Sequence, residues 1–524
     1  EIPWSDWSSD VCSSDLNIAA MEQAGKELVK IEVPASWKQC EMLPLRTFAK
    51  DVPKEFTDVF YPTTLLEGDR FPVSKFTAGG YQMTNTSKYE KRGFAVSVPV
   101  WNPEKCTQCN QCSVMCPHAV VRPFLLDAEE VKKAPAAFKS IPATGDELKG
   151  LNFRIQTSPL DCTGCEVCVN VCPTQSLSMK PLTEVSEVEG KNWEYAMTLT
   201  NKGDRVDKTT VRGSQFQTPM MEFNGACAGC GETQYVKMLT QLFGSKMMFA
   251  NAMGCSMAWA GMSGLVPFTK DSKGYGPVYT TSLFEDNAEF GFGLVKSNNI
   301  KRARLQSAVE AALQSDASAE LKSTLQKWLD NKSDKAACDE LYEELKPMLA
   351  KEQSKPAVKA VQDYEDMLPV ITTWIYGGDG WAYDIGFGGL DHVLASGENV
   401  KMLVMDTEMY ANTGGQQSKA TQMSAVAKFA AGGKKLMKKD LGRVAMNYEN
   451  IYVASIAIGA DPKQAIKAMT EANSYDGPAI VIAYSPCQQH GMPAKLGMSH
   501  QADEQRKAVE SGYWPLYRYD PRRR

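Results

Sequence analysis

Two runs of four closely spaced cysteines limit what this chain can fold around more than any other feature of its sequence. Both have the spacing C-x2-C-x2-C-x3-C followed by proline, so they form an internal repeat. At this spacing three thiolates bind one four-iron cluster, and the fourth binds the cluster of the other run. The sequence therefore predicts two 4Fe–4S clusters with crossed ligation. One ligand set is Cys106, Cys109, Cys112 and Cys172, and the other is Cys162, Cys165, Cys168 and Cys116.

Zinc is the alternative to iron at these cysteines. Structural zinc sites use paired C-x2-C units around one tetrahedral ion, which two runs of four cysteines do not match. Clusters held by four thiolates have reduction potentials on the order of several hundred millivolts below zero. We therefore expect a protein that handles strongly reducing electrons.

The composition excludes several other functions. The chain has 524 residues, enough to bury its cores without disulfides, so its fifteen cysteines indicate metal or redox chemistry in a reducing compartment. The net charge is −5 and the charged residues are interspersed, which argues against a nucleic-acid partner. No apolar run reaches the length of a membrane span, and no secretory signal is supported. We expect a cytoplasmic protein with no membrane partner.

The order of motifs predicts an α/β fold, in which a parallel-sheet domain follows a ferredoxin-like α+β domain. Apolar β-type runs that end in Gly-containing loops and precede helical stretches indicate the parallel sheet. The opening residues show no helical or strand period, and we interpret them as a non-native scar. The predicted parts are the scar (1–16), the tail of a preceding domain with a linker (17–94), the ferredoxin-like domain (95–182), a polar connector (183–218), the α/β domain (219–513) with a helical insertion at about 300–355, and a truncated carboxyl-terminal segment (514–524).

A third group of cysteines is suggested by position in the predicted sheet. Cys227 and Cys230 form a C-x2-C pair in a Gly-rich turn, which alone is equally compatible with a redox dithiol or half a zinc site. Cys255 and Cys487 fall in loops at the carboxyl ends of predicted strands. Such loops converge on the ligand crevice of an open α/β sheet. The four can share one more cluster, although spacing alone leaves the alternatives open.

Two further loops at the same edge have the composition of a diphosphate and magnesium site. A strand at Thr372–Tyr376 leads into the 377–381 loop (GGDGW), and a strand at Met402–Met405 leads into the 406–415 loop (DTEMYANTGG). The glycines let backbone amides approach an anion, and a helix after each loop can point its amino terminus at a phosphate. Asp379 offers a charged oxygen to magnesium, and Thr407 and Asn412 offer neutral ones. A lone GDG is common in turns, but the pair of loops is similar to the bipartite thiamine-diphosphate motif.

Taken in order, these motifs resemble the 2-oxoacid:ferredoxin oxidoreductases, and in particular the carboxyl-terminal half of the single-chain pyruvate:ferredoxin (flavodoxin) oxidoreductases. The resemblance implies that Cys227, Cys230, Cys255 and Cys487 bind the cluster nearest thiamine. It also implies that Asp379, Thr407 and the carbonyl of Met409 hold Mg²⁺. The implied cofactor-binding residues are Glu232, Cys255, Gly378, Asp379, Gly380, Trp381, Thr407, Glu408, Met409, Tyr410, Ala411 and Asn412.

The implied activity is the oxidative decarboxylation of pyruvate to acetyl-CoA and CO₂. Electrons would pass from thiamine diphosphate through three 4Fe–4S clusters to ferredoxin or flavodoxin, in a homodimer that uses coenzyme A. The family's pyrimidine- and pyruvate-binding domain has no place before Ala95. We therefore expect an inactive fragment, with no certain catalytic residue, unless an amino-terminal half or a partner chain completes it.

Two alternatives remain at this point. One is a non-catalytic electron-transfer module, a ferredoxin-like carrier fused to a docking domain, which leaves the loops of Asp379 and Thr407 without a use. The other is a relative that acts on a different 2-oxo acid.

Overall fold

The computed structural model describes residues 11–39, 46–261, 265–282, 285–490, 492 and 497–523, with the backbone alone for residues 11–17 and His490. The chain divides into two compact units, Glu1–Val52 and Pro53–Arg524. In the first unit, helix α1 (Val11–Lys26) precedes one 3-10 turn, η2 (Ala35–Gln39). The side chains of residues 18–39 are all exposed.

Helix α1 crosses the boundary that the sequence predicts for the scar. The sequence predicts no helix before Asn17, and this prediction is wrong for residues 11–16, which are part of α1. Residues 1–10 lie outside the described residues. Ala19, Ala20, Met21 and Glu22 are strong helix formers. A nucleated helix extends into adjacent residues at small cost, so this run carries the helix back into a segment without a period of its own.

The second unit begins with short helical turns that are anchored to the later α/β domain. They are η3 (Phe56–Phe60), α2 (Tyr61–Thr64), η4 (Gly68–Arg70), η5 (Val73–Lys75), η6 (Ala78–Gly80) and η7 (Ser87–Tyr89). Phe56 and Phe60 are buried. The backbone N–H of Val266 donates to Thr86 Oγ1 over 2.7 Å, and Ser87 Oγ donates to the carbonyl of Val266 over 2.9 Å.

The ferredoxin-like region consists of two small antiparallel sheets and the two cysteine loops. Strand β1 (Ser97–Trp101) pairs with β5 (Leu177–Pro181), and β4 (Asn152–Thr157) pairs with both β2 (Val121–Leu126) and β3 (Ile141–Pro142). Short helices α3 (Gln111–Val114) and α5 (Val167–Asn170) each begin one residue before the third cysteine of a run, and α4 (Ala128–Lys133) follows β2. The two copies share backbone shape, because matched positions have positive φ. These pairs are Gln108 and Gly164, Asn110 and Glu166, and Ala119 and Gln175.

The segment predicted as a polar connector, 183–218, contains a helix instead. Helix α6 (Leu182–Ala196) buries Trp193 in the same core as Phe153 and Leu177 of the ferredoxin-like sheets. Two further turns follow, η10 (Gly203–Arg205) and α7 (Val211–Ser214). Only one face of α6 is buried, so its mean composition is polar. Composition alone therefore does not reveal the helix.

The α/β domain is built on a seven-stranded sheet with the order β14-β12-β13-β9-β8-β6-β7. All neighbouring pairs are parallel except β14 with β12. The strands are β6 (Met247–Asn251), β7 (Val278–Thr281), β8 (Thr372–Gly378), β9 (Lys401–Asp406), β12 (Tyr452–Ile456), β13 (Ala479–Tyr484) and β14 (Tyr517–Tyr519). The parallel α/β sheet after a ferredoxin-like domain confirms the predicted fold class.

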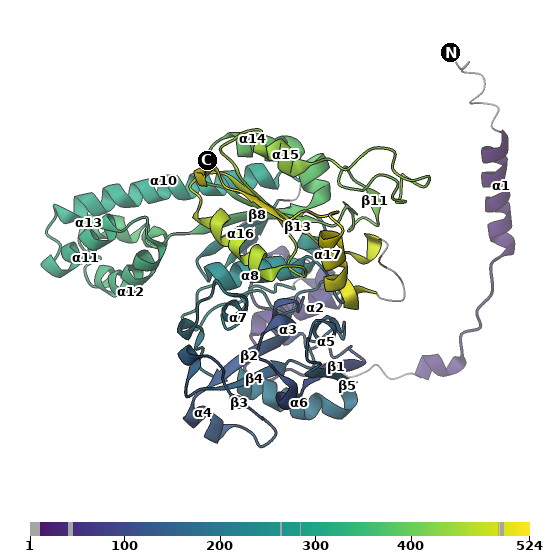
Figure 1. Ribbon diagram of the computed structural model, residues 1–524, viewed down its shortest axis with the longest axis horizontal. Coiled ribbons are helices and arrows are strands. Elements are labelled where there is room, and N and C mark those ends of the chain that lie inside the picture. Colours follow the sequence, from purple (N-terminus) through teal and green to yellow (C-terminus); the bar gives the residue numbers. More distant parts are fainter. Residues whose placement is uncertain are drawn as a thin grey trace, which may run out of the picture. The chain divides into compact units, whose positions relative to one another are not determined.

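Helices cover both faces of this sheet (Figure 1). On one face α8 (Thr233–Phe243) and α16 (Pro462–Ser474) pack into a core with Leu403 and Met405 of β9. On the other face α10 (Asn287–Leu313), α14 (Phe387–Ala395) and α15 (Leu441–Met446) pack with Met402 and Val404. Because both faces are buried, inner strands such as β12 and β13 are buried along their whole length and largely apolar, as is typical of parallel sheets. Helices α9 (Cys255–Gly261) and α17 (Gln501–Glu510) lie near the carboxyl ends of strands.

The helical insertion has a core of its own. The second half of α10 packs with α11 (Ala319–Asp330), α12 (Lys335–Lys351) and α13 (Pro356–Gln362), followed by the turn η11 (Glu365–Met367). Cys338 is buried in this core, together with Trp328 and Leu345. The insertion starts from a helix that is already part of the domain, since α10 also contacts β6 and β8.

The carboxyl-terminal segment, predicted as a truncated remnant, completes the sheet. Strand β14 pairs antiparallel with β12, and the turn η15 (Pro521–Arg523) follows it. Trp514 is buried and donates from Nε1 to the carbonyl of Ile456 over 3.1 Å. A three-residue strand is too short to show a period, and its pairing depends on β12, which lies sixty residues earlier in sequence.

Within the described residues, no helix combines the length and apolar character needed to cross a bilayer.

Candidate functional site

The structure brings the eight repeat cysteines together in two groups of four, each with one cysteine from the other run. In the first group, burial raises the pKa of the Cys112 thiol, and the neighbouring thiolates of Cys109, Cys106 and Cys172 raise it further. In the second group, Cys116, Cys162, Cys165 and Cys168 line one small cavity. Each grouping follows the crossed ligation expected from the spacing. Four cysteines gathered at one place fit a four-iron cluster, whose irons would stabilise the thiolate form that burial disfavours.

Backbone N–H groups point at several of these sulfurs. In both runs the residue two places after the first cysteine donates to it: Gln108 to Cys106 Sγ and Gly164 to Cys162 Sγ, each over 3.4 Å. Ser176 N donates to Cys172 Sγ over 3.2 Å. Such hydrogen bonds favour the thiolate and tune the potential of a bound cluster.

The third group of cysteines lines a cavity of about 170 Å³ at the carboxyl edge of the sheet. Cys227 and Cys230 lie in the turn before α8, and Cys487 follows β13. Cys255 was expected in a loop, but it is the first residue of α9, directly after β6. Gly231 permits the close packing of the turn, because a Cβ there would lie 2.4 Å from the carbonyl of Pro486.

The same cavity holds several residues expected to meet the cofactor, from the 406–415 loop and from the turn before α8. Besides the four cysteines, its lining includes Glu232, Thr407, Ala411 and Asn412. Burial raises the pKa of Glu232 to about 7, and Trp259 Nε1 donates to its carboxylate over 2.8 Å. Glu232 is therefore a buried acid held in a fixed orientation beside the cysteines.

The three groups expected to hold Mg²⁺ converge. Thr407 donates to Asp379 Oδ1 from Oγ1 over 2.9 Å and from its backbone N–H over 3.1 Å, and Thr407 Oγ1 lies 3.0 Å from the carbonyl oxygen of Met409. Burial, with the charge of Asp406, raises the pKa of Asp379 to about 7. Ser418, which sequence reasoning missed, donates to Asp379 Oδ2 over 2.6 Å. A buried carboxylate whose hydrogen bonds come from neutral groups fits a site for a divalent cation.

The two loops meet because β8 and β9 are adjacent parallel strands. Only the first loop is followed by a helix: the π-helical turn η12 (Gly380–Ile385) leads into α14. The second loop folds back through the short strands β10 (Met409–Tyr410) and β11 (Gln416–Gln417), so the expected helix after it is absent from this part of the described chain. Paired oxygens and glycines at 406–415 do not distinguish a helix start from a hairpin, which explains the error.

The other expected cofactor residues support the loops rather than line the cavity. Glu408, at φ +65°, accepts hydrogen bonds from Lys438 Nζ over 2.9 Å, from Gln422 and from Tyr513. Gly380 packs against the ring of Tyr410, and the Trp381 ring packs against Gly377. Gly378 is the last residue of β8. Lys438 also bonds Asp406, over 2.8 Å, and neither contact has a signal in the local sequence.

The described residues contain no group of three His, Cys, Asp or Glu side chains close enough to hold a single metal ion. A four-iron cluster keeps its thiolates further apart than one ion does, so this finding does not bear on clusters. The described cysteines are all free of disulfides.

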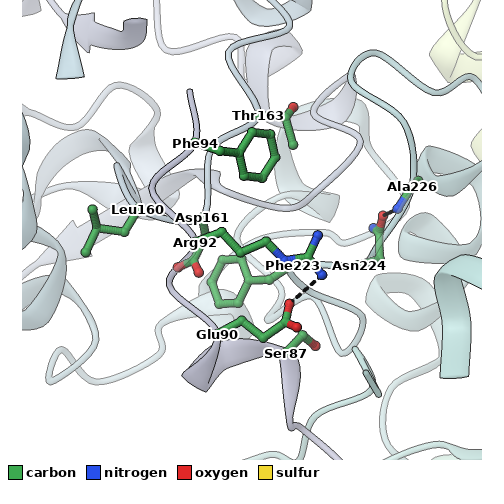
Figure 2. Close-up of a pocket in the computed structure, with 10 residues that line it drawn as sticks. All are labelled: Ser87, Glu90, Arg92, Phe94, Leu160, Asp161, Thr163, Phe223, Asn224 and Ala226. Carbon is green, nitrogen blue, oxygen red and sulfur yellow. Dashed lines mark hydrogen bonds and ion pairs between the residues drawn. The ribbon is translucent and has the colours of Figure 1, made fainter. Parts of the chain in front are cut away.

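The second and third cysteine groups are neighbours. A backbone hydrogen bond from Gly229 opposes the burial that raises the pKa of Cys165. His118 is buried, with Nε2 3.0 Å from the carbonyl oxygen of Ala226 and Nδ1 3.4 Å from Thr163 Oγ1. A small hollow beside these loops is lined by Glu90, Arg92, Thr163, Asn224 and Ala226, among others, and Glu90 pairs with Arg92 over 2.7 Å (Figure 2).

Four family models match the chain. They are described as a 4Fe-4S dicluster domain (residues 105–176), the thiamine pyrophosphate enzyme C-terminal TPP-binding domain (357–483), the pyruvate-ferredoxin oxidoreductase insertion domain (301–356) and a domain of unknown function named EKR (45–95). The matches give independent support to the dicluster fold and to the thiamine-diphosphate-binding domain.

Similar proteins are also known over nearly the whole chain. A pyruvate:ferredoxin oxidoreductase from Moorella thermoacetica is 48% identical over 97% of this chain and 44% of its own length. A pyruvate-flavodoxin oxidoreductase from Klebsiella pneumoniae is 45% identical over 97% of this chain and 43% of its own. This chain thus spans less than half the length of these relatives. A solved 2-oxoglutarate:ferredoxin oxidoreductase from Magnetococcus marinus, at 17% identity and a TM-score of 0.33 over 52% of this chain and 66% of that one, is too distant to support an argument.

Fold and site together define an iron–sulfur oxidoreductase with a thiamine-diphosphate-binding α/β domain. The insertion domain and the high identity of the relatives narrow this class. The chain is similar, over 97% of its length, to part of the pyruvate:ferredoxin and pyruvate-flavodoxin oxidoreductases.

Proposed function

We propose that this chain carries the electron-transferring part of an enzyme that decarboxylates pyruvate oxidatively to acetyl-CoA and CO₂. In this proposal it binds three 4Fe–4S clusters, thiamine diphosphate and Mg²⁺, and delivers electrons to ferredoxin or flavodoxin. The observation that carries the proposal is one shared cavity, which four cysteines from three separate segments line together with Glu232, Thr407 and Asn412. Coenzyme A, a homodimeric assembly and a cytoplasmic location belong to the proposal through the family resemblance.

The proposed cation site would fix the cofactor's diphosphate. Thr407 Oγ1 lies within hydrogen-bond distance of both Asp379 Oδ1 and the Met409 carbonyl oxygen, so these three groups could supply oxygen ligands to one small cation. Asp379 would be the charged ligand of Mg²⁺, and the ion would supply positive charge to offset that of the buried carboxylate and of a diphosphate. When bound, thiamine diphosphate supplies a nucleophilic carbon and an electron sink, and the clusters supply one-electron carriers.

The contacts between cysteine groups support an order for electron transfer. The third group lies at the cofactor cavity, and it neighbours the second group through Gly229 and Cys165. The second group neighbours the first, because Cys112 is among the charges that raise the pKa of Cys168. Electrons would thus pass from the cavity through the third and second groups to the first.

Metal content tests the three clusters. Anaerobically purified protein should contain about twelve iron atoms and as many acid-labile sulfides per chain. Cys487→Ser should lower both by about a third, and Cys338→Ser is the matched control, because Cys338 is buried in the separate core of the insertion. Zinc in place of iron, or equal losses in both variants, would contradict the proposal.

Calorimetry separates the enzyme from a simple electron carrier. Thiamine diphosphate with Mg²⁺ should release heat on binding to the chain, and Asp379→Asn should abolish the Mg²⁺-dependent part. A carrier that uses the α/β domain only for docking should show no binding heat. The choice of 2-oxo acid is then tested by comparing pyruvate with other 2-oxo acids in the completed enzyme.

A further inference from the structure

A lysine is buried in the middle of helix α8, where the α/β domain meets the ferredoxin-like domain. Lys237 is 1% exposed, and the described residues provide it with no ion pair to a carboxylate. The helix starts immediately after Cys230 and Glu232, and one of its faces lies on the first cysteine run: Gln234 Nε2 donates to the carbonyls of Cys230 over 2.8 Å and of Met115 over 3.3 Å. A buried charge without a countercharge is costly, so its retention requires a reason.

The Lys237 side chain is bound as an ammonium. Nζ donates to three backbone carbonyls, those of Ser113, of Val114 over 2.9 Å and of Cys116 over 3.0 Å. An ammonium has three N–H donors and no acceptor, so three carbonyls satisfy it fully. All three partners of Nζ are acceptors, so the surroundings offer no donor to the lone pair of a neutral amine and favour the ammonium.

The position of this charge relates it to both repeat clusters. Cys112 belongs to the first cysteine group and Cys116 to the second. Lys237 Nζ bonds the carbonyl of Ser113, the residue after Cys112, and the carbonyl of Cys116 itself. The nearby cation Arg122 differs, because it forms a buried ion pair with Glu222. Lys237 is thus the charge in this region that no described acidic side chain compensates.

We propose that the Lys237 ammonium is the internal countercharge of the two ferredoxin-like clusters and raises the reduction potentials of both. The inference rests on the two repeat clusters of the proposed function, and it adds a role for a residue of the other domain. One-electron reduction adds one negative charge to a cluster and breaks no bond. A nearby positive charge stabilises the reduced form more than the oxidised form, so it favours acceptance of an electron from the third group.

The test uses the full chain with its clusters reconstituted anaerobically. Dithionite supplies electrons in the presence of redox mediators, and EPR follows each reduced cluster as the potential is lowered. Lys237→Gln keeps two N–H donors for the carbonyls but removes the charge. Lys237→Met removes both, and Lys237→Arg keeps the charge.

Lys401→Met is the matched control. Lys401 is also a buried lysine, 4% exposed, and Nζ donates to the carbonyls of Tyr475 and Gly477. It begins β9, at the amino-terminal edge of the sheet, whereas the cysteine cavity lies at the carboxyl edge. Its removal should cost stability without changing a cluster potential.

In Lys237→Gln we expect the reduction equilibrium of both repeat clusters to weaken at least tenfold, which is a fall of about 59 mV for a one-electron couple. Lys237→Arg and Lys401→Met should stay near wild type. Loss of the clusters in the Gln and Met variants, with retention in Lys237→Arg, also supports the inference, because the charge is then what matters.

Three results would overturn it. Cluster reduction potentials in Lys237→Gln that match wild type would show that the charge of Lys237 does not affect the clusters. Loss of clusters in Lys237→Arg as well would assign Lys237 to packing alone. Wild-type protein with no EPR-active repeat clusters would overturn both this inference and the proposed function, whereas the first two results leave the proposed function intact.

Discussion

Buried lysines in the α/β domain differ in what compensates their charge. Lys438 lies between two fully buried carboxylates, with Nζ 2.8 Å from Asp406 Oδ2 and 2.9 Å from Glu408 Oε1. Lys401 is bonded to carbonyls instead. The two ion pairs of Lys438 hold the loop of Thr407 in place. At Lys401 no carboxylate in contact offsets the cost of removing the charge from water. Each has a measurable consequence.

Removal of Lys438 should be strongly destabilising. In Lys438→Met two carboxylates stay buried without their cation, and breaking a buried ion pair in this way costs about 3–5 kcal/mol. Denaturant unfolding of the apo chain measures the loss. The adjacent variant Lys439→Met is the control. Lys439 is half-buried and donates to the carbonyl of Tyr383 over 3.2 Å, so its loss should cost about 1 kcal/mol. Equal effects would mean that the pairing contributes little.

Lys401 should make stability depend on pH. Burial lowers its folded-state pKa to about 7 from the ordinary value of 10.5. Between these values the unfolded chain holds more protons than the folded chain, so stability rises with pH across this window. Lys401→Met removes this pH-dependent penalty. The free energy of unfolding of the variant minus that of wild type should therefore be larger at pH 7 than at pH 10, by on the order of 2 kcal/mol.

Unfolding of wild type and variant at both pH values measures this difference. The exposed Lys467→Met on α16 should show no such difference between the two pH values. A Lys401→Met curve that parallels the wild-type curve would show that Lys401 stays charged in the fold without penalty.

At the residue scale, the sequence predicts the ligand cysteines well because their spacing is local and chemically specific. It does not predict Ser418, Lys438 or Lys237. These side chains act on groups 39, 30 and 121 residues away in sequence, counted to Asp379, Glu408 and Cys116. No local period marks such partners, so they become visible only when the chain is folded.

At the scale of elements, the segment before β1 contacts the second cysteine loop and stabilises its position. Lys91 forms an ion pair with Asp161, whose side chain is 2% exposed and which immediately precedes Cys162. The same ammonium lies 4.9 Å above the ring of Phe223. Together with the contacts of Thr86 and Ser87 to Val266, this pair ties the EKR segment to both domains.

Loss of the Lys91–Asp161 ion pair should lower the stability of the chain. Lys91→Met leaves Asp161 buried without its partner, which should destabilise the chain by about 3 kcal/mol. Asp161→Asn in the same chain should recover part of the loss, because the uncompensated charge is gone. A double-mutant cycle on the denaturant midpoint measures the coupling. Additive effects of the two substitutions would show that the contact carries no coupling energy.

Strand β14 should protect the edge of the sheet. A chain shortened to end at Leu516 loses β14 and the ion pair of Arg518 with Glu471, and exposes the hydrogen-bonding edge of β12. Exposed edge strands pair with other chains. Size-exclusion chromatography should therefore show association of the shortened chain at concentrations where the full chain does not associate. Arg518→Ala, which removes the ion pair but keeps the strand, is the control and should behave as the full chain.

The sequence predicts best the elements that have a strong apolar pattern. Strands β8, β9, β12 and β13 are continuous apolar runs, and their burial on both faces explains why they are recognisable. Helix α6 was missed because its average composition is polar. Strand β14, for which the sequence made no prediction, is too short to show a period. The helix expected after 406–415 was wrong because the hairpin there depends on pairing between Met409 and Gln417.

At the scale of the whole molecule, the chain spans 44% of the length of its Moorella relative. We expect it to hold clusters but not to turn over pyruvate alone, because the activating glutamate and the pyruvate-binding residues implied by the resemblance are not among its residues. Pyruvate-dependent reduction of a viologen dye should stay at background for the isolated chain, although dithionite reduces its clusters. Addition of the remaining part of such an enzyme should restore turnover, and robust turnover by the chain alone would refute the expectation.

By itself, the sequence determined the iron–sulfur chemistry and the class of fold. Both follow from short-range patterns: cysteine spacing sets which sulfurs reach one cluster, and apolar runs set which segments form a buried parallel sheet. Only the tertiary structure decided that four cysteines from three separate segments share a cavity with Thr407 and Asn412, and that Lys237 of one domain lies on the cysteine loop of the other. Those juxtapositions depend on strand order and domain docking, which arise from packing between residues far apart in the chain.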